Sequence, residues 1–483
     1  MRYADLAVIL AYLVAITLFG ARFKENQKTL RDYFLGGRNT PWWAIAFSIV
    51  SAETSTLTVI GTPAISFNGN FGFLQVVFGY LLARLVIVTL LLPHYFRGEM
   101  FTAYELMQRR FGPRIRRFTA GSFLALRAMA EGVRVFAISI VISIVLGTGE
   151  AVSILLIVCL TLFYTFEGGL TAVIWTDVVQ MILYVAGAVL SLFVILGHIP
   201  GGWDHIFAVA GAKFTVLDLR TDFLAPDFFS RTYSIWAGVI GGCFLTTASH
   251  GTEQLMVQRL LAARSEGDSR KALLSSWAVI LFQFSLFLLI GVLLFVYYQD
   301  ARLAPPNPPD RIYPAFVWQH LPVGVAGLII AAILAAAMSN LSAALNSLAS
   351  TTIMDFWKPL SRRERTDEEW LGLARRATVA WGAILFGIAL IAQGVQSVLQ
   401  AGLSIASVVY GALLGVFLLG VLTKRVGESA AIAGMVASLL TMIYVKAGTS
   451  IAWTWYVVIG TGVTIAVALI ASLFETRKES AHV

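Results

Sequence analysis

Residues 41–67 read PWWAIAFSIVSAETSTLTVIGTPAISF and combine two properties that rarely occur together. The segment is long enough to cross a membrane, yet Glu53 lies in its middle among serines and threonines, and a Gly-Thr-Pro step follows at residues 61–63. A carboxylate in hydrocarbon costs about 2.5–3.5 kcal/mol on insertion scales, and residues that bear this cost usually mark a transport path. Glycine and proline inside a hydrophobic segment indicate a broken helix and a binding site near the bilayer midplane. We therefore expect a break at residues 61–63; the alternative is a kinked span whose hydroxyl groups bond their own backbone.

The rest of the chain has the composition of a protein that crosses the bilayer many times. Of its 483 residues, 58% are hydrophobic and 13% are charged, against roughly 25% charged in soluble domains. Because a spanning helix needs about 20 apolar residues, we count about thirteen spans and predict an all-α membrane protein. Their approximate limits are 4–22, 41–66, 71–95, 117–147, 150–166, 172–197, 232–262, 271–298, 318–356, 374–394, 398–420, 426–446 and 451–474.

The basic residues of the connecting segments predict the orientation in the membrane. The loops on one side of the predicted spans carry about 25 Lys and Arg, and the loops on the other side carry about 7. Cytoplasmic loops hold the excess of basic residues, so we expect the N-terminus outside and the C-terminus inside, in the cytoplasmic (inner) membrane. The net charge of +8 therefore reflects orientation and does not indicate a nucleic-acid partner.

A second interrupted span lies within residues 232–262, where residues 241–254 read GGCFLTTASHGTEQ. By the loop charges, this seventh span runs opposite to the second span, which is the pattern of an inverted repeat with broken helices. We interpret the chain as a single transmembrane transporter domain over residues 1–483. Its parts are a peripheral first helix and loop at 1–40, a first repeat at 41–197, an outer loop at 198–231, a second repeat at 232–420 and peripheral C-terminal helices at 421–483.

Polar side chains also occur inside other spans. Arg127, Glu131 and Arg134 share one helical face of span 4. They either form an internal ion pair or leave an arginine, for which we choose Arg127, to bind an anionic group with its planar fork. Residues 335–344 of span 9, AAAMSNLSAA, are small enough for close helix packing and also supply oxygen ligands that suit a hard cation. Asp177 begins span 6, where it could cap the helix or gate an inner path.

Several of these stretches resemble the sodium/solute symporter family, whose members carry sugars, proline, iodide, monocarboxylates and sialic acids. Residues 168–180, GGLTAVIWTDVVQ, resemble the family signature, and residues 253–263 look like its span 7 exit. Residues 335–339 look like its sodium-site helix, and the Gly-Thr-Pro step is similar to that of its second span. The resemblance implies a LeuT-like fold with a 5+5 inverted repeat, in which helices 2 and 7 are broken. The sequence contains no metalloprotease, nucleophile-elbow or Walker motif, so we do not expect an enzyme.

The resemblance also implies a sodium site between spans 2 and 9. Anchoring on residues 61–63 places two backbone carbonyl ligands at Ser51 and Thr54, whereas a second possible register places them at Phe47 and Val50. The ligands expected from span 9 are Ala336, Ser339 and Asn340, the last of which departs from the family's usual serine or threonine. A second cation site or an inner gate is expected at Asp177 and Ser342, although Ala343 replaces a further hydroxyl there.

Substrate contacts implied by the same resemblance cluster after the carbonyl pair and on spans 3, 4 and 7. They are Glu53, Ser55, Thr58, Gln75, Phe78, Arg127, Thr246, Ser249 and His250. Glu53 could ligate sodium, bind a substrate amine or carry a proton. We expect sodium-coupled symport of a small organic anion by a monomer in the lipid bilayer. The alternatives are a sugar or amino-acid substrate, or proton coupling through Glu53.

Overall fold

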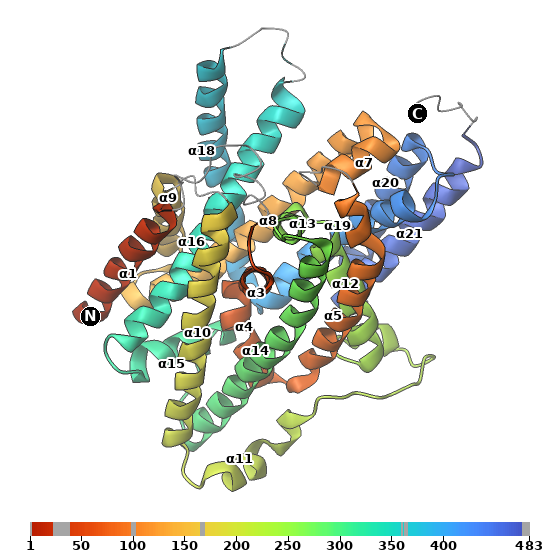
Figure 1. Cartoon of the computed structure of the whole chain (residues 1–483). Coiled ribbons are helices and arrows are strands. Elements are labelled where there is room, and N and C mark those ends of the chain that lie inside the picture. Colours follow the sequence, from red (N-terminus) through yellow and green to blue (C-terminus); the bar gives the residue numbers. More distant parts are fainter. Residues whose placement is uncertain are drawn as a thin grey trace.

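The computed structural model describes residues 2–22, 39–97, 103–164, 170–358, 361 and 366–475, and its architecture is helical (Figure 1). The helices before residue 200 are α1 (Tyr3–Ala21), α3 (Trp42–Glu53), α4 (Thr56–Asn68), α5 (Leu74–Val86), α6 (Leu92–Phe96), α7 (Ala103–Phe111), α8 (Pro113–Leu146), α9 (Glu150–Tyr164) and α10 (Leu170–His198). The later helices are α11 (Gly202–Ala210), α12 (Ile235–Gly251), α13 (Gln254–Leu261), α14 (Glu266–Asp300), α15 (Ile312–His320), α16 (Val325–Thr351), α18 (Asp367–Ile391), α19 (Val398–Leu422), α20 (Glu428–Gly448) and α21 (Tyr456–Ser472). The prediction of an all-α protein is confirmed.

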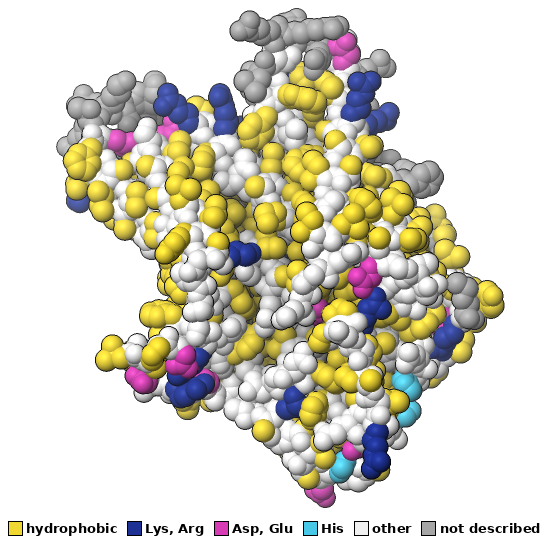
Figure 2. Space-filling view, turned by 180° about the vertical axis from the view of Figure 1, so that it is seen from behind, with side chains coloured by type: hydrophobic (Ala, Val, Ile, Leu, Met, Phe, Trp, Pro, Cys, Tyr) yellow, Lys and Arg dark blue, Asp and Glu magenta, His cyan; other side chains and the backbone are white. Residues whose placement is uncertain are grey.

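Long apolar helices make up most of the molecule. Within the described ranges, nine helices are long and apolar enough to cross a membrane, and the bent pair of α3 and α4 makes a tenth. The apolar helices α1 and α9 are shorter. Apolar side chains cover the middle of the face in Figure 2, whereas most charged side chains lie toward its two ends. This distribution fits the apolar helices of a multi-pass membrane protein.

The second predicted span is broken, but at a different place from the one expected. Helix α3 ends at Glu53 and α4 begins at Thr56, and the two axes differ by 62°. The expected break at residues 61–63 is wrong, because Pro63 lies inside α4. A neighbouring helix supports this part of α4, where the Ser66 hydroxyl donates hydrogen bonds to the Pro63 and Leu288 carbonyls. Such contacts allow a membrane helix to continue through proline.

The seventh predicted span is interrupted at the end of the expected stretch. Helix α12 continues to Gly251, and α13 begins at Gln254. The glycine pair that suggested an earlier interruption serves helix packing instead. A Cβ atom added to Gly242 would lie 2.3 Å from the Val76 carbonyl oxygen of α5, and one added to Gly241 would lie 2.2 Å from the Thr454 carbonyl oxygen.

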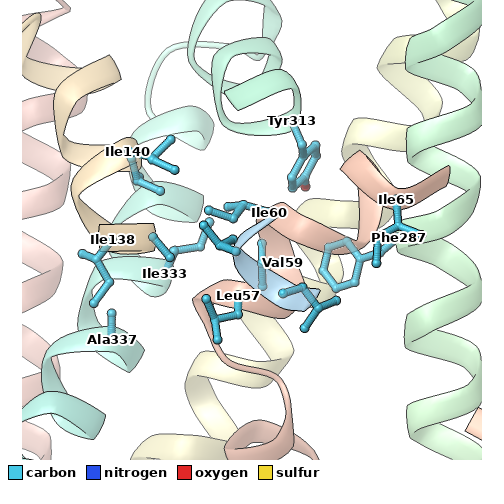
Figure 3. Close-up of a cluster of buried hydrophobic side chains, with 14 of the residues drawn as sticks. Leu57, Val59, Ile60, Ile65, Ile138, Ile140, Phe287, Tyr313, Ile333 and Ala337 are labelled. Carbon is cyan, nitrogen blue, oxygen red and sulfur yellow. The ribbon is translucent and has the colours of Figure 1, made fainter. Parts of the chain in front are cut away.

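Several helices pack against α4, the second half of the broken second span. Helix α14 packs against both α3 and α4, and α8, α15 and α16 also contact α4. Figure 3 shows the apolar cluster that results, which contains Leu57, Val59, Ile60, Ile65, Ile138, Ile140, Phe287, Tyr313, Ile333 and Ala337. In Figure 1, α1 lies at one side of the molecule, and α20 and α21 lie at the other. The broken helices therefore lie between longer helices.

Replacing Gly242 with alanine is expected to destabilise the protein by about 1–3 kcal/mol, because the added methyl group would push α12 away from the α5 backbone. Thermal unfolding in detergent measures this loss. The matched control is Gly462→Ala on α21, where an added Cβ meets nothing within 4 Å. Equal unfolding temperatures for the two variants would contradict the close approach of α5 and α12.

Candidate functional site

The two helix breaks lie side by side, and a polar contact joins them. Glu53 is the last residue of α3, and His250 precedes the final residue of α12. The Nε2 atom of His250 lies 3.2 Å from Oε2 of Glu53, and its Nδ1 atom lies 2.9 Å from the Ser249 hydroxyl. The imidazole ring is therefore held on both sides. Three of the predicted substrate residues, Glu53, Ser249 and His250, come together here.

Arg84 of α5 is the second partner of Glu53. Its Nη2 atom lies 2.8 Å from Oε2 of Glu53, and its side chain is fully buried. The remaining guanidinium nitrogens donate to the Leu273 carbonyl and the Ser276 hydroxyl of α14 and to the Tyr80 carbonyl. From the sequence, Arg84 could serve either Glu53 or Glu99, and no role was assigned to it; Glu99 lies outside the described residues, and the structure pairs Arg84 with Glu53. The sequence signal is a basic residue and an acidic residue in the middle of adjacent spans. Because an isolated charge is costly in hydrocarbon, the two side chains are expected to pair.

The first residues of α4 lie across the break from Glu53. Ser55 precedes the helix in an extended conformation, and its side chain makes no capping hydrogen bond to the described part of α4. Thr58 follows in the first turn, and its hydroxyl lies 3.4 Å from the Glu53 carbonyl oxygen. Both side chains are buried. A helix N-terminus carries a partial positive charge, so this position can bind an anionic group.

The second half-helix that starts at a break, α13, already has an anion at its N-terminus. Its N-cap residue is Glu253, whose carboxylate lies 3.2 Å from Arg127 Nη1 and accepts a hydrogen bond from Tyr410. Arg127 also pairs with Glu131 at 3.0 Å, as its i, i+4 spacing allows. The structure thus places Arg127 in the internal ion pair that the sequence left as an alternative, on the α13 side of the site.

The remaining predicted substrate residues have other surroundings. The Gln75 side chain of α5 bonds three backbone groups: its Oε1 accepts from the Asp218 N–H, and its Nε2 donates to the Tyr233 and Gly72 carbonyls. Gln75 lies in the lining of a cavity of about 230 Å³. Thr246 is buried in α12, and Phe78 is partly buried against the main apolar cluster.

The expected sodium ligands lie on α3 and α16. Because α3 ends at Glu53, the carbonyl groups of its last turn lack further helical partners. The Val50 carbonyl, an alternative ligand, instead accepts from the Thr54 N–H at 2.8 Å. The Thr54 hydroxyl donates to the side-chain oxygen of Gln283 at 3.0 Å. Oxygen atoms are thus concentrated at the end of α3.

Helix α16 supplies the second part of the expected sodium site. Ala336 and Ser342 are buried, and Asn340 is partly buried. Helix α16 contacts both α4 and α10. The side chain of Ser339 lies outside the described residues, as do Gly168 and Gly169 of the family-like signature.

Asp177 lies in a separate buried cluster beside Ser48, in the middle of α3. Its Oδ2 atom is 3.0 Å from Arg259 Nη2 and accepts a hydrogen bond of 2.8 Å from the Ser48 hydroxyl. The Arg259 Nε atom also donates to Ser48. The structure does not bring Asp177 into contact with Ser342 among its described hydrogen bonds and ion pairs. Asp177 therefore joins α10 to α3 and α13.

Comparison with known proteins assigns this architecture to a class. Residues 33–438 match the model of the sodium:solute symporter family, and the chain belongs to this family. It is thus a sodium-coupled solute symporter with a LeuT-like fold, and its family consists of transporters rather than enzymes.

Individual relatives cover nearly the whole chain. The chain is 30% identical over 493 residues to the sodium/sialic acid symporter SiaT of Proteus mirabilis, covering 99% of this chain and 96% of that protein. It is 28% identical over 459 residues to the sodium/glucose cotransporter of Vibrio parahaemolyticus, covering 91% and 84%. A solved substrate-bound, outward-open Na+-coupled sialic acid symporter superposes with a TM-score of 0.82 at 28% identity, covering 98% of both chains. The transporter Mhp1, at 13% identity and a TM-score of 0.55, shares the fold alone.

Proposed function

We propose that this chain couples the inward movement of sodium to the uptake of a small organic anion across the cytoplasmic membrane. The break between α3 and α4 carries this proposal, because it places the carbonyl end of α3 next to the N-terminus of α4, which Ser55 does not cap with its side chain. The carbonyl groups suit a cation, and the N-terminus suits an anion. Relatives that transport sialic acid, an organic acid, support the same substrate class.

The proposed topology has thirteen spans, with the N-terminus outside, the C-terminus inside and a monomer as the transporting unit. Spans 2–6 and 7–11 form the 5+5 inverted repeat. Packing between the halves supports this arrangement, because α5 packs on α12 while α14 packs on α3 and α4. Each pair joins the first element of one half to the second element of the other, as a two-fold axis requires. Likewise, α8 packs on α18, and α16 packs on α9.

The proposed sodium site uses the carbonyls of Ser51 and Thr54 together with Ala336, Ser339 and Asn340. The Val50 carbonyl, a ligand of the alternative register, already accepts a hydrogen bond from the Thr54 N–H. This contact supports the register that uses the Ser51 and Thr54 carbonyls. Sodium at this site would bind α3 to α16 and stabilise the outward-open state in which substrate enters. Coupling requires that the ion bind this state more tightly than the inward-open state.

The proposed substrate site is the start of α4, with Ser55 and Thr58 binding the anionic group. Thr246, Ser249, His250 and Phe78 would contact the rest of the solute. Glu53 contacts Arg84 and His250, so we assign it a structural role beside the substrate site rather than a substrate amine or a proton. A sugar remains the second candidate because of the sodium/glucose cotransporter relative.

A thermal-shift screen of the purified chain with carboxylates, sugars and amino acids, each in sodium and in potassium, tests the proposal. We expect a carboxylate to raise the unfolding temperature in sodium only.

In reconstituted vesicles, Ser339→Ala should weaken sodium activation of uptake at least about tenfold, or about 1.4 kcal/mol. Asn346→Ala, at an exposed position on the same helix, is the matched control. Normal sodium activation of the Ser339→Ala variant would exclude the site, and stabilisation by sugars alone would exclude the anion.

A further inference from the structure

Four exposed basic side chains lie where several of the long apolar helices begin or end. They form what we call the basic patch, which consists of Arg114, Arg117, Lys424 and Arg425. The two arginines of α8 lie three residues apart near its start and therefore share one helical face. The other two residues lie in the connection between α19 and α20. None of the four side chains has an ion pair or a hydrogen bond with the residues that the structure describes.

Hydrogen bonds hold the two parts of the basic patch next to each other. Arg110, at the end of α7, donates from Nη2 to the carbonyls of Thr423 and Val426, which flank the two basic residues of the connection. The Glu428 carboxylate of α20 accepts from the Ile115 N–H of α8 at 3.0 Å. The start of α8 and the α19–α20 connection are therefore neighbours, although they lie about 300 residues apart in the sequence.

Two carboxylates of this region bind helix starts rather than the basic patch. Glu428 accepts from backbone N–H groups in the first turn of α8. Glu475 accepts from the Gly427 and Ala430 N–H groups at the start of α20. A helix N-terminus carries a partial positive charge, which stabilises a carboxylate placed there. The four basic side chains are thus left without an acidic partner and can bind an external anion.

Exposed apolar side chains border the basic patch. Leu422, the last residue of α19, is 63% exposed, and Leu473 and Phe474, which follow α21, are 80% and 83% exposed. The adjacent Glu475 holds this segment against the start of α20. Helices α8, α19, α20 and α21 are all long and apolar enough to span a membrane, so the patch lies at one membrane face. A phospholipid presents a phosphate group and acyl chains at this depth.

We propose that the basic patch binds the headgroup of an anionic phospholipid. The phosphate group lies between the arginines of α8 and the α19–α20 connection, and the acyl chains lie against the exposed apolar side chains beside them. A free phosphate ion would gain only the first contact, and a zwitterionic lipid would bring a positive group to a positive surface. The bound lipid would join α8 to the peripheral helices α20 and α21. This inference does not depend on which solute the chain transports.

Thermal unfolding of the full chain in detergent, titrated with lipid, tests the proposal. Short-chain phosphatidylglycerol should raise the unfolding temperature, whereas phosphatidylcholine of the same chain length and inorganic phosphate should not. Replacing all four basic residues with glutamine should weaken phosphatidylglycerol binding at least about hundredfold, because each basic residue near a membrane surface adds roughly a fivefold gain in affinity for anionic lipid. The pair Arg114→Gln with Arg117→Gln should by itself weaken binding more than about tenfold.

The matched control removes the same amount of charge from exposed positions on α14 and α18. It replaces with glutamine Arg270, Lys271, Arg375 and Arg376, and it should bind phosphatidylglycerol as the unaltered chain does. Replacing the two arginines of the patch with lysine keeps the charge and should also preserve binding. Equal stabilisation by phosphatidylcholine or by inorganic phosphate would overturn the proposal, as would full affinity of the variant with four glutamines. Lipid binding is measured without transport, so absence of sodium-dependent uptake would count against the proposed function only.

Discussion

Replacing Arg84 with methionine should lower the free energy of unfolding by about 3–5 kcal/mol, the usual cost of removing one partner from a buried ion pair. The Arg84 side chain is fully buried, and its Nη2 atom lies 2.8 Å from Glu53. Methionine fills a similar volume but leaves the Glu53 carboxylate with His250 and without a permanent positive charge. Unfolding in detergent, followed by tryptophan fluorescence, measures the loss.

The double variant Glu53→Gln with Arg84→Met separates the charge from the packing. Because it removes both charged groups, it should recover most of the lost stability. Arg270→Met is the matched control, since Arg270 pairs with Glu266 on a surface where the side chains are 47% and 33% exposed. Its loss should stay below about 1 kcal/mol. A double variant as unstable as Arg84→Met alone would show that packing, rather than charge, makes Arg84 necessary.

Asp310 should make the stability of the protein depend on pH. It lies in the short 3-10 turn η7 (Pro309–Arg311), outside the long spans, and is fully buried. One carboxylate oxygen accepts from the Val398 N–H at the start of α19, and the other has no hydrogen-bond partner among the described residues. The neighbouring Arg311 is directed to Glu150 instead. Burial raises the pKa of Asp310 from 3.8 to about 7, although the Val398 N–H opposes this.

The sign of the effect follows from this direction. A carboxyl group whose pKa is higher in the folded protein holds its proton more tightly there. Its contribution to the stability of the folded protein is therefore fully present below the unfolded pKa of 3.8. The contribution is lost as the pH rises through about 7. The full change is roughly 4 kcal/mol. Asp310→Asn, which stays uncharged, should therefore gain stability relative to the unaltered chain as the pH rises from about 5 to about 8.

Thermal unfolding across this pH range measures the difference. Asp204→Asn, at an exposed position on α11, is the matched control and should follow the unaltered chain at every pH. Parallel pH profiles for Asp310→Asn and the unaltered chain would contradict a buried, unpaired carboxyl group at this position.

Much of the architecture follows from local properties of the chain. A run of about 20 apolar residues must form a helix in lipid, because its backbone groups have no other partners. Most of the predicted spans therefore overlap long apolar helices, although the second span breaks at Glu53 rather than at the expected residues 61–63. The i, i+4 spacing of Arg127 and Glu131 likewise indicates the ion pair that the structure contains.

The exact position of the breaks could not be obtained in this way. Proline and glycine pointed to residues 61–63, yet α4 continues through Pro63 because a neighbouring helix supports it. The glycines at 241 and 242 allow close approach of other segments rather than ending a helix. Both cases show a local preference overruled by contacts between helices that are distant in the sequence.

The sequence by itself determined the class of the protein, the approximate spans and the family, since these depend on hydrophobicity and on motifs within single segments. Only the tertiary structure decided how the polar residues are paired. Glu53 pairs with Arg84 and His250, Gln75 accepts from the Asp218 N–H, and Asp177 pairs with Arg259. The physical reason is that a charged group in a dry interior must find its partner on another helix, and the choice depends on how the helices pack in three dimensions.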